Sequence, residues 1–240
     1  MFKSKKKDLN MPVIVFANSK GGVGKSTSAL VLSQVLAKHQ ASVSLIDADP
    51  NQPLSDWARR SDGRLPRNLT LLPKVTEDSI MDAIDDAAEQ SAFVVVDLEG
   101  TANLAMSYAI GRADLVLVPM QGSQLDADQS RRVINLIRRE EKAFRRHIPY
   151  AVFFTRTSAA IRPKDLTHIS SDLEASGINR IKVEMTERAA FRTIMQLGGS
   201  IYDLAGSEVS NPQAAIENAE AFTREVTNTI KMNEKQEVAA

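Results

Sequence analysis

Short hydrophobic stretches without regular polar interruptions recur along the chain, and they alternate with longer stretches of helical periodicity. Runs such as PVIVFA and AFVVVDL are typical of strands buried on both faces of a parallel sheet, because neither face then needs polar side chains. Helices must cover both faces of such a sheet. We expect strands at residues 12–17, 42–47, 92–98, 114–120, 150–155 and 178–185, and a less regular seventh strand at residues 68–73.

The stretches between these strands predict the helices. The last helix is marked by Asn211, a good N-cap residue, and by Pro212, which suits the first helical turn. Frequent alternation of strands and helices favours an α/β fold, with a doubly wound, mostly parallel sheet and helices on both faces. The predicted helices cover residues 25–39, 76–90, 101–111, 125–146, 162–175, 187–197 and 212–231.

Composition limits the classes of protein to which the chain can belong. Its 240 residues, 43% of them hydrophobic, suffice for a single domain, which we place at residues 12–231. A disordered basic tail at residues 1–11 and a polar tail at residues 232–240 flank that domain. The chain has no cysteine, no hydrophobic run of the roughly 18 residues that span a bilayer, and no apolar run of a signal peptide, so we expect a cytoplasmic protein.

A glycine-rich stretch, FANSKGGVGKSTSAL, connects the first predicted strand to the first predicted helix. Gly21, Gly22 and Gly24 allow the positive φ values that turn backbone N–H groups inward, and the helix N-terminus adds partial positive charge. Lys25 can reach the β- and γ-phosphate oxygens of a nucleotide, and the Ser26 hydroxyl can ligate Mg²⁺. The stretch therefore predicts a P-loop with the phosphate-binding residues Lys20, Gly21, Gly22, Val23, Gly24, Lys25, Ser26 and Thr27.

The loop departs from the ordinary pattern G-x-x-x-x-G-K-[ST], because Ser19 stands where that pattern has its first glycine. The stretch KGGVGKS instead resembles the deviant Walker A motif of the ParA/MinD family of ATPases. This resemblance implies that the chain binds ATP with Mg²⁺ and forms a homodimer around two nucleotides. In that family the early lysine, here Lys20, contacts the phosphates bound by the partner subunit, much as an arginine finger supplied in trans does.

Aspartates follow two further predicted strands, at the edge where a parallel sheet places its ligand-binding residues. Asp47 and Asp49 in LIDADPNQP can face Mg²⁺ and the attacking water. Asp97, after AFVVV, resembles a Walker B aspartate that holds Mg²⁺ through water. We therefore expect Lys20, Asp47 and Asp49 to be catalytic, and Ser26, Asp47 and Asp97 to bind the metal.

Both aspartate segments differ from the family's usual pattern. LIDADPNQP resembles the segment D-x-D-P-Q, but Asn51 separates Pro50 from Gln52, which leaves a Mg²⁺ role of Gln52 open. The segment DLEG at residues 97–100 departs from the family's usual switch segment, D-x-P-P. Glu99 and Gly100 replace its two prolines, so the switch segment here would differ in stiffness from that of the family.

Other features sort the chain among the members of the family. FFTRTS at residues 153–158 lacks the aspartate with which GTP-binding relatives grip guanine, which favours ATP. The cysteine ligands of nitrogenase iron proteins and arsenical pump ATPases are missing, and the ending KMNEKQEVAA lacks the amphipathic helix of membrane-binding MinD-type members. The resemblance is to small ParA-type partition ATPases without a DNA-binding domain ahead of the phosphate loop.

This resemblance implies an ATPase whose dimer binds nonspecific DNA on the nucleoid, does not bind membranes, and positions a plasmid, a chromosome or other cargo. A partner protein, of ParB type or an adaptor, would stimulate hydrolysis. Because 30 basic residues balance 30 acidic ones, DNA binding needs a local basic surface. One candidate is the pair Arg188 and Arg192, in a segment that resembles the family's DNA-contacting region. Another is the arginine series of residues 125–146, which includes Arg132, Arg139 and Arg146.

Two other functions fit the same phosphate loop. A positioning ATPase that acts on a protein scaffold or in DNA transfer would hydrolyse ATP without binding nonspecific DNA. An ATP-dependent biosynthetic enzyme of dethiobiotin synthetase type would instead require a small carboxylation substrate.

Overall fold

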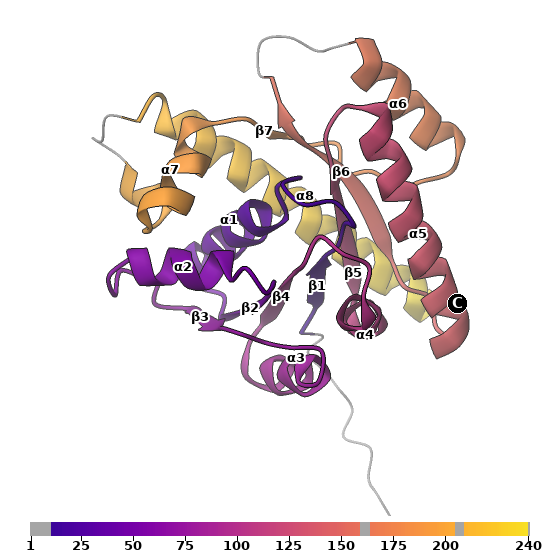
Figure 1. Cartoon of the computed structure of the whole chain (residues 1–240), viewed down its shortest axis with the longest axis horizontal. Coiled ribbons are helices and arrows are strands. Elements are labelled where there is room, and N and C mark those ends of the chain that lie inside the picture. The colour runs from indigo at the N-terminus through magenta and orange to yellow at the C-terminus, as the bar shows by residue number, and fades with distance from the viewer. Residues whose placement is uncertain (1–10, 159–163, 205–208, 240) are drawn as a thin grey trace, which may run out of the picture.

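The computed structural model of the chain describes residues 11–158, 164–204 and 209–239, so the predicted basic tail lies almost wholly outside the described residues. Seven parallel strands form one sheet, in the order β3-β2-β4-β1-β5-β6-β7 (Figure 1). The strands are β1 (Val13–Phe16), β2 (Val43–Ala48), β3 (Leu69–Leu72), β4 (Phe93–Leu98), β5 (Leu115–Met120), β6 (Tyr150–Thr157) and β7 (Met185–Thr186).

Helices cover both faces of the sheet, as the hydrophobic runs predict (Figure 1). One face carries α3 (Ile80–Gln90), α4 (Leu104–Arg112), α5 (Gln124–Phe144) and α6 (Lys164–Ala175). The other face carries α1 (Lys25–Lys38), α2 (Pro53–Arg60), α7 (Ala189–Leu197), α8 (Pro212–Ala239) and the short 3₁₀ helix η1 (Ile201–Leu204). The doubly wound α/β fold is therefore confirmed.

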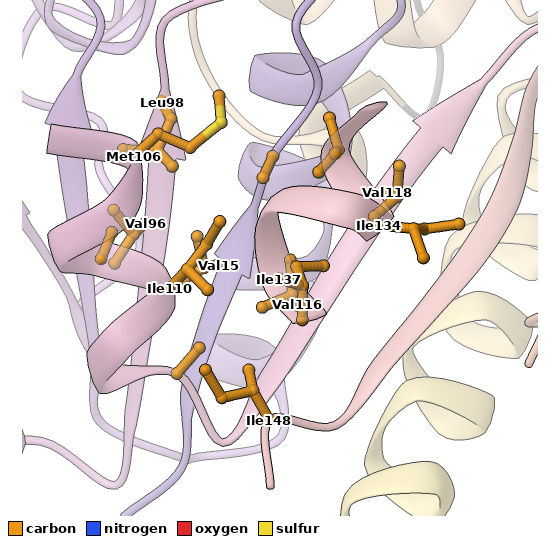
Figure 2. Close-up of a cluster of buried hydrophobic side chains, with 14 of the residues drawn as sticks. Val15, Val96, Leu98, Met106, Ile110, Val116, Val118, Ile134, Ile137 and Ile148 are labelled. Carbon is orange, nitrogen blue, oxygen red and sulfur yellow. The ribbon is translucent and has the colours of Figure 1, made fainter. Parts of the chain in front are cut away.

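Strand β1 shows why its residues are uniformly hydrophobic. Val13 and Val15 pack into the core beneath α3, α4 and α5, whereas Ile14 and Phe16 pack into the core beneath α1 and α8. Figure 2 shows the first of these cores, in which Val15 lies among side chains from β4, β5, α4 and α5. A strand at the centre of such a sheet has no solvated face, so a polar residue at any of these positions would be buried.

The hydrophobic pattern does not predict helix α2. Only Leu54 and Trp57 of its eight residues are buried, which is too few to reveal a helical period. The helix is held by a distant partner, since the Trp57 Nε1–H donates to the carbonyl of Gly199 over 2.9 Å. Its first turn follows the segment of Asp47 and Asp49 and so belongs to the edge that carries the predicted site.

Several predicted boundaries are wrong. Helices α3 and α4 begin at Ile80 and Leu104 instead of residues 76 and 101. The strand predicted at residues 178–185 is reduced to β7, because the Glu225 carboxylate accepts the N–H groups of Lys182 and Val183, over 2.6 and 2.7 Å, that a longer strand would use. Helix α5 ends two residues early, since Arg145 adopts a φ of +52°. Helix α8 continues to Ala239 instead of ending at residue 231, so that its last turns extend through most of the predicted polar tail.

Gly198 should be the most sensitive glycine of the fold. It ends α7 with φ +79° and ψ −169°, a conformation that is almost exclusive to glycine, and a Cβ there would lie 2.4 Å from the backbone nitrogen of Ser61. We expect Gly198→Ala to lower the free energy of unfolding by about 3 kcal/mol or more, or roughly 6–12 °C in Tm.

Gly63→Ala is the matched control, because Gly63 also has a positive φ, +76°, but open space around it. It should cost only about 1 kcal/mol. Equal losses of stability for the two variants, measured by thermal unfolding, would contradict the close approach of α7 to the end of α2.

Candidate active site

The predicted phosphate loop and both aspartate segments meet at one edge of the sheet, at the carboxyl ends of β1, β2 and β4. They surround a cavity of about 380 Å³. Strand β1 lies between β4 and β5, and the chain crosses to opposite sides of it, which is where open α/β sheets bind ligands. The cavity lining includes Gly21, Gly22, Gly24, Lys25, Ser26, Thr27, Asp49, Glu99 and Gly100.

The backbone of the loop is shaped for an anion. Gly22 and Gly24 have φ values of +74° and +93°, and Gly24 caps α1 without any side chain that would take up the first N–H groups of the helix. These N–H groups have no carbonyl partner in the preceding turn and are available to phosphate oxygens. The Asn18 amide fixes the entry to the loop, because its Nδ2 donates to the carbonyl of Pro119 over 2.6 Å and its Oδ1 accepts from the Lys20 N–H over 2.9 Å.

Lys25 is 5% exposed and folds back over the loop, where its Nζ donates to the Lys20 carbonyl over 3.2 Å. Burial lowers the pKa of Lys25, while the charges of Asp97, Asp49 and Glu99 oppose that shift. The ammonium group therefore lies within electrostatic reach of three carboxylates. A bound polyphosphate would provide the additional negative charge that favours the protonated form.

Asp97 and Asp47 are fully buried on neighbouring strands, β4 and β2, where they are paired in register. Neither oxygen of Asp97 accepts a hydrogen bond of ordinary geometry from the described residues, and the same holds for Oδ1 of Asp47. The other Asp47 oxygen accepts from the N–H and hydroxyl of Ser55, over 2.8 and 2.7 Å. Buried carboxylate oxygens without partners are incomplete sites, and a hard cation is the partner that suits them.

Burial raises the pKa of Asp97 to about 8, against the opposing effects of the nearby Ser26 hydroxyl and the Lys25 ammonium. Burial also raises the pKa of Asp47, while its bonds from Ser55 lower it. The residues fit Mg²⁺ in the form in which it accompanies nucleotides, with one or two carboxylates and the phosphates as ligands. A site made by the protein alone is not indicated, since the described residues contain no group of three or more His, Cys, Asp or Glu side chains placed to hold a metal.

The structure places Lys20 against its own subunit. Its Nζ pairs with Oδ1 of Asp126 at 2.8 Å, and the Asp126 side chain is 2% exposed while that of Lys20 is 35% exposed. Asp126 is held by Ser123, the N-cap of α5, whose hydroxyl donates to Oδ2 of the same carboxylate. Nearby, the Ser19 hydroxyl donates to Oε1 of Gln129 over 2.9 Å, so the start of the loop is anchored to α5 at a second point.

A second cavity, of about 290 Å³, adjoins the loop at Gly24 and Thr27 and is walled by β6 and α7. The Thr155 hydroxyl donates to the Val23 carbonyl over 2.7 Å and so joins β6 to the loop. Arg156 lines both cavities with a φ of +53°, an unusual conformation for an arginine. A nucleotide with its phosphates on the loop would have room for its base here.

The predicted DNA-contacting arginines of α7 line this second cavity. The Nε of Arg188, the N-cap residue of α7, donates to the Thr186 hydroxyl over 2.9 Å. Arg192 is exposed and pairs with Glu187 at 2.8 Å. Both arginines therefore border the edge of the sheet that carries the predicted phosphate loop.

The arginines of the α5 region have different environments. Arg132 and Arg139 are exposed on the helix, and within the described residues Arg139 makes only a long ion pair, with Glu140 at 3.7 Å. Arg146 lies beyond the end of α5, and its Nη2 donates to the carbonyls of Gly111 and Ala113 at the end of α4. The three arginines therefore do not share a single helical arc, and Arg146 is already bonded within the fold.

Asp126, Arg156 and Ser55 also belong to this edge and are not among the residues predicted from the sequence. A local signal existed for Asp126, since SQLD at residues 123–126 has the [ST]-x-x-[DE] spacing of a helix cap. Its ion pair joins residues 106 apart in the chain and has no local signature.

Comparison with known proteins identifies the family. The family model of the VirC1 protein matches residues 11–235. Protein ParA of Rhizobium radiobacter is 45% identical over 212 residues, which cover 88% of this chain and 94% of that protein. Protein virC1 of Rhizobium rhizogenes is 30% identical over 197 residues, which cover 78% of this chain and 82% of the relative.

The fold is shared with solved structures of lower sequence identity. The ATP complex of a Cyanothece McdA variant is 16% identical and superimposes with a TM-score of 0.74, over 91% of this chain and 97% of the other. These findings confirm the resemblance carried by the phosphate loop. The chain therefore belongs to the VirC1 family of ParA-type ATPases.

Proposed function

We propose that the chain is an ATPase that forms a dimer around two molecules of ATP and Mg²⁺, binds nonspecific DNA as that dimer, and positions cargo through cycles of hydrolysis. The observation that carries the proposal is the loop with two lysines, on which Lys25 is folded inward and Lys20 reaches outward from the cavity to Asp126. In a lone protomer, Lys25 would therefore contact the bound phosphate, while Lys20 would stay paired with Asp126.

Within one protomer, the loop N–H groups from Gly21 to Thr27 and the Lys25 ammonium would hold the phosphates. Ser26, Asp47 and Asp97 would hold Mg²⁺, directly or through water, because Ser26 lines the cavity, its hydroxyl lies near the Asp97 carboxylate, and Asp47 is paired in register with Asp97. The ion would neutralise charge on the β- and γ-phosphates. Asp49, half-buried at the cavity wall, would face the attacking water.

Lys20 would act on the nucleotide of the other subunit. To do so it must leave Asp126, whose buried carboxylate would then lose its cation. Breaking a buried pair leaves an uncompensated charge, so this exchange is favourable only when the partner's phosphates replace Asp126. The ion pair would thus keep Lys20 inactive in the monomer and make hydrolysis depend on dimer formation.

DNA would bind the dimer through basic side chains, and a partner protein would stimulate hydrolysis. Arg132 and Arg139 offer exposed guanidinium groups on α5, and Arg188 and Arg192 offer a second pair next to the nucleotide cavity. No helix in the described part of the chain is long and apolar enough to cross a bilayer. ATP turnover that proceeds without nonspecific DNA binding would favour a scaffold-directed or DNA-transfer ATPase instead.

The test of this proposal is the ATPase rate of the native chain and of Lys20→Ala, each with and without nonspecific DNA. We expect Lys20→Ala to bind ATP, to remain monomeric, and to hydrolyse ATP on the order of 10²–10³ times more slowly, because one cation is missing in the transition state. Asp126→Asn should have the opposite effect on assembly and form dimers at lower protein concentration.

Lys231→Ala, at an exposed lysine of α8, is the control and should behave like the native chain. Dimerisation is measured by light scattering with ATP and Mg²⁺. If Lys20→Ala dimerises and hydrolyses ATP like the native protein, the role of Lys20 in trans is wrong.

The buried carboxylate of Asp97 should make the stability of the metal-free protein depend on pH. The unfolded chain releases this proton above about pH 4, whereas the folded protein keeps it up to about pH 8. The folded state then binds more protons, so its free energy of unfolding falls as the pH rises through this interval, by at most about 1.4 kcal/mol per pH unit. Asp97→Asn removes that slope.

We therefore expect the Tm of Asp97→Asn, minus that of the native chain, to increase between about pH 5 and pH 8 in EDTA without nucleotide. Because the charge of Asp47 also raises the pKa of Asp97, this difference reports Asp97 together with its interaction with Asp47. Addition of ATP and Mg²⁺ should raise the Tm of the native chain by more than it raises the Tm of Asp97→Asn. A difference in Tm that is independent of pH would refute the raised pKa of Asp97.

Charge reversal separates the two DNA surfaces. Each phosphate contact contributes about 0.9 to the slope of log K against log salt, so two contacts contribute about 2 in the native chain. Replacing both arginines with glutamate removes these contacts and adds repulsion from the phosphates. We expect Arg188→Glu with Arg192→Glu to abolish ATP-dependent DNA binding, and Arg132→Glu with Arg139→Glu to weaken it less. Because Arg188 and Arg192 line the second cavity beside the phosphate loop, the ATP affinity of the double variant is measured in parallel. If DNA binding survives the loss of Arg188 and Arg192, these residues are not the DNA-binding surface.

A further inference from the structure

Glu99 lies in the turn between β4 and α4 and lines the cavity of the phosphate loop. The next residue, Gly100, holds this turn directly against the loop. A Cβ on Gly100 would lie 2.8 Å from the backbone nitrogen of Gly21 and 3.0 Å from the Lys20 carbonyl carbon, so only glycine permits this approach. The backbone of Glu99 is thereby placed beside the residues that would hold the phosphates.

The Glu99 side chain is oriented by α4. Nδ2 of Asn103 donates to Oε2 of Glu99 over 3.2 Å, while Oδ1 of the same asparagine accepts the Met106 N–H over 2.9 Å and caps the helix. Asn103 is thus fixed by the helix it caps and presents its amide group to Glu99. The second oxygen of Glu99, Oε1, accepts no hydrogen bond from the described residues.

Two of the carboxylates at this edge are open to the cavity, and two are not. Asp47 and Asp97 are fully buried, whereas Asp49 and Glu99 are half-buried and line the cavity. Oδ1 of Asp49 accepts the backbone N–H and the side-chain amide of Asn51, over 2.8 and 2.9 Å, and its Oδ2 accepts no hydrogen bond from the described residues. Glu99 is half-buried, close enough to Lys25 that its charge acts on that ammonium, and directed by Asn103. A water between Glu99 and the terminal phosphate would have an acceptor on one side and its target on the other.

We propose that Glu99 is a second catalytic carboxylate, which accepts a hydrogen bond from the attacking water and orients it toward the γ-phosphorus, with Asn103 as its positioning residue. This inference rests on the proposed ATPase activity. In the step, the bond between the water oxygen and the γ-phosphorus forms and the bond from the γ-phosphorus to the β–γ bridging oxygen breaks. ADP leaves, and both protons of the water leave with the phosphate as dihydrogen phosphate.

The first test is Glu99→Gln in the full chain with ATP and Mg²⁺. Glutamine retains the size of the side chain and can still accept from Asn103, but its other group is a donor and cannot accept a hydrogen bond from water. We expect kcat to fall by about 10²-fold, while the Kd of a fluorescent ATP analogue changes by less than about threefold. The dimer of the variant should also have a longer lifetime than the native dimer. The nucleotide recovered from the variant dimer after quenching should be ATP and not ADP.

The second test is Asn103→Ser, which retains a good N-cap for α4 and removes only the amide donor. We expect a fall in kcat of about three- to tenfold in the native background and no further fall in the Glu99→Gln background, because residues that act through one another are not additive. An additive effect would overturn the positioning role of Asn103.

The outcomes distinguish the two levels of the proposal. A Glu99→Gln variant that turns over ATP like the native chain, or that loses rate only in proportion to nucleotide affinity or Tm, overturns the role of Glu99 and leaves the ATPase proposal intact. A native chain that binds no ATP, or binds it without turnover, overturns the proposed function itself and this inference with it.

Discussion

The burial of Lys25 among carboxylates is the constraint on which the site depends. A lysine that is 5% exposed can stay charged only with negative charge nearby, and the parallel sheet supplies it by ending β2 and β4 at the same edge as β1. Asp97 and Asp47 are paired in register there. The helical crossovers on both faces make the strands parallel, and parallel strands bring their aspartates to the same edge of the sheet. Without these carboxylates, Lys25 could not be buried as a charged residue.

The phosphate loop could be predicted from the sequence because its chemistry is local. Gly22 and Gly24 carry the positive φ values that their position in the motif requires, and Lys25 follows at the first turn of a helix as the spacing demands. The uniformly hydrophobic strands were equally predictable, since a strand that is buried on both faces has a hydrophobic residue at every position. Asp97 and Asp47 belong with them, because an aspartate that ends such a strand must lie at the ligand-binding edge.

What the sequence did not reveal depends on contacts between distant segments. Helix α2 is held by the bond from Trp57 to Gly199, and the strand predicted before Met185 is pre-empted by the Glu225 carboxylate of α8. The ion pair of Lys20 and Asp126 is the most important of these omissions. The motif alone suggests that Lys20 points toward another subunit. Only the fold shows that the buried carboxylate of Asp126 binds Lys20 within the same subunit.

The charges of the site also bear on how a nucleotide must enter it. Asp97, Asp49 and Glu99 all lie within electrostatic reach of Lys25, and burial raises the pKa of Asp97 to about 8. A polyphosphate that arrived alone would therefore add its negative charge to that of Asp49 and Glu99, and to that of Asp97 wherever it is ionised, near a single inward lysine. Coulomb repulsion in a partly buried site is screened weakly. A cation that arrived with the phosphates would meet the oxygens of Asp97 that accept no hydrogen bond from the described residues, and the same carboxylates would then be its ligands. We therefore expect the charge of the site to favour nucleotide that carries its own metal ion over free nucleotide.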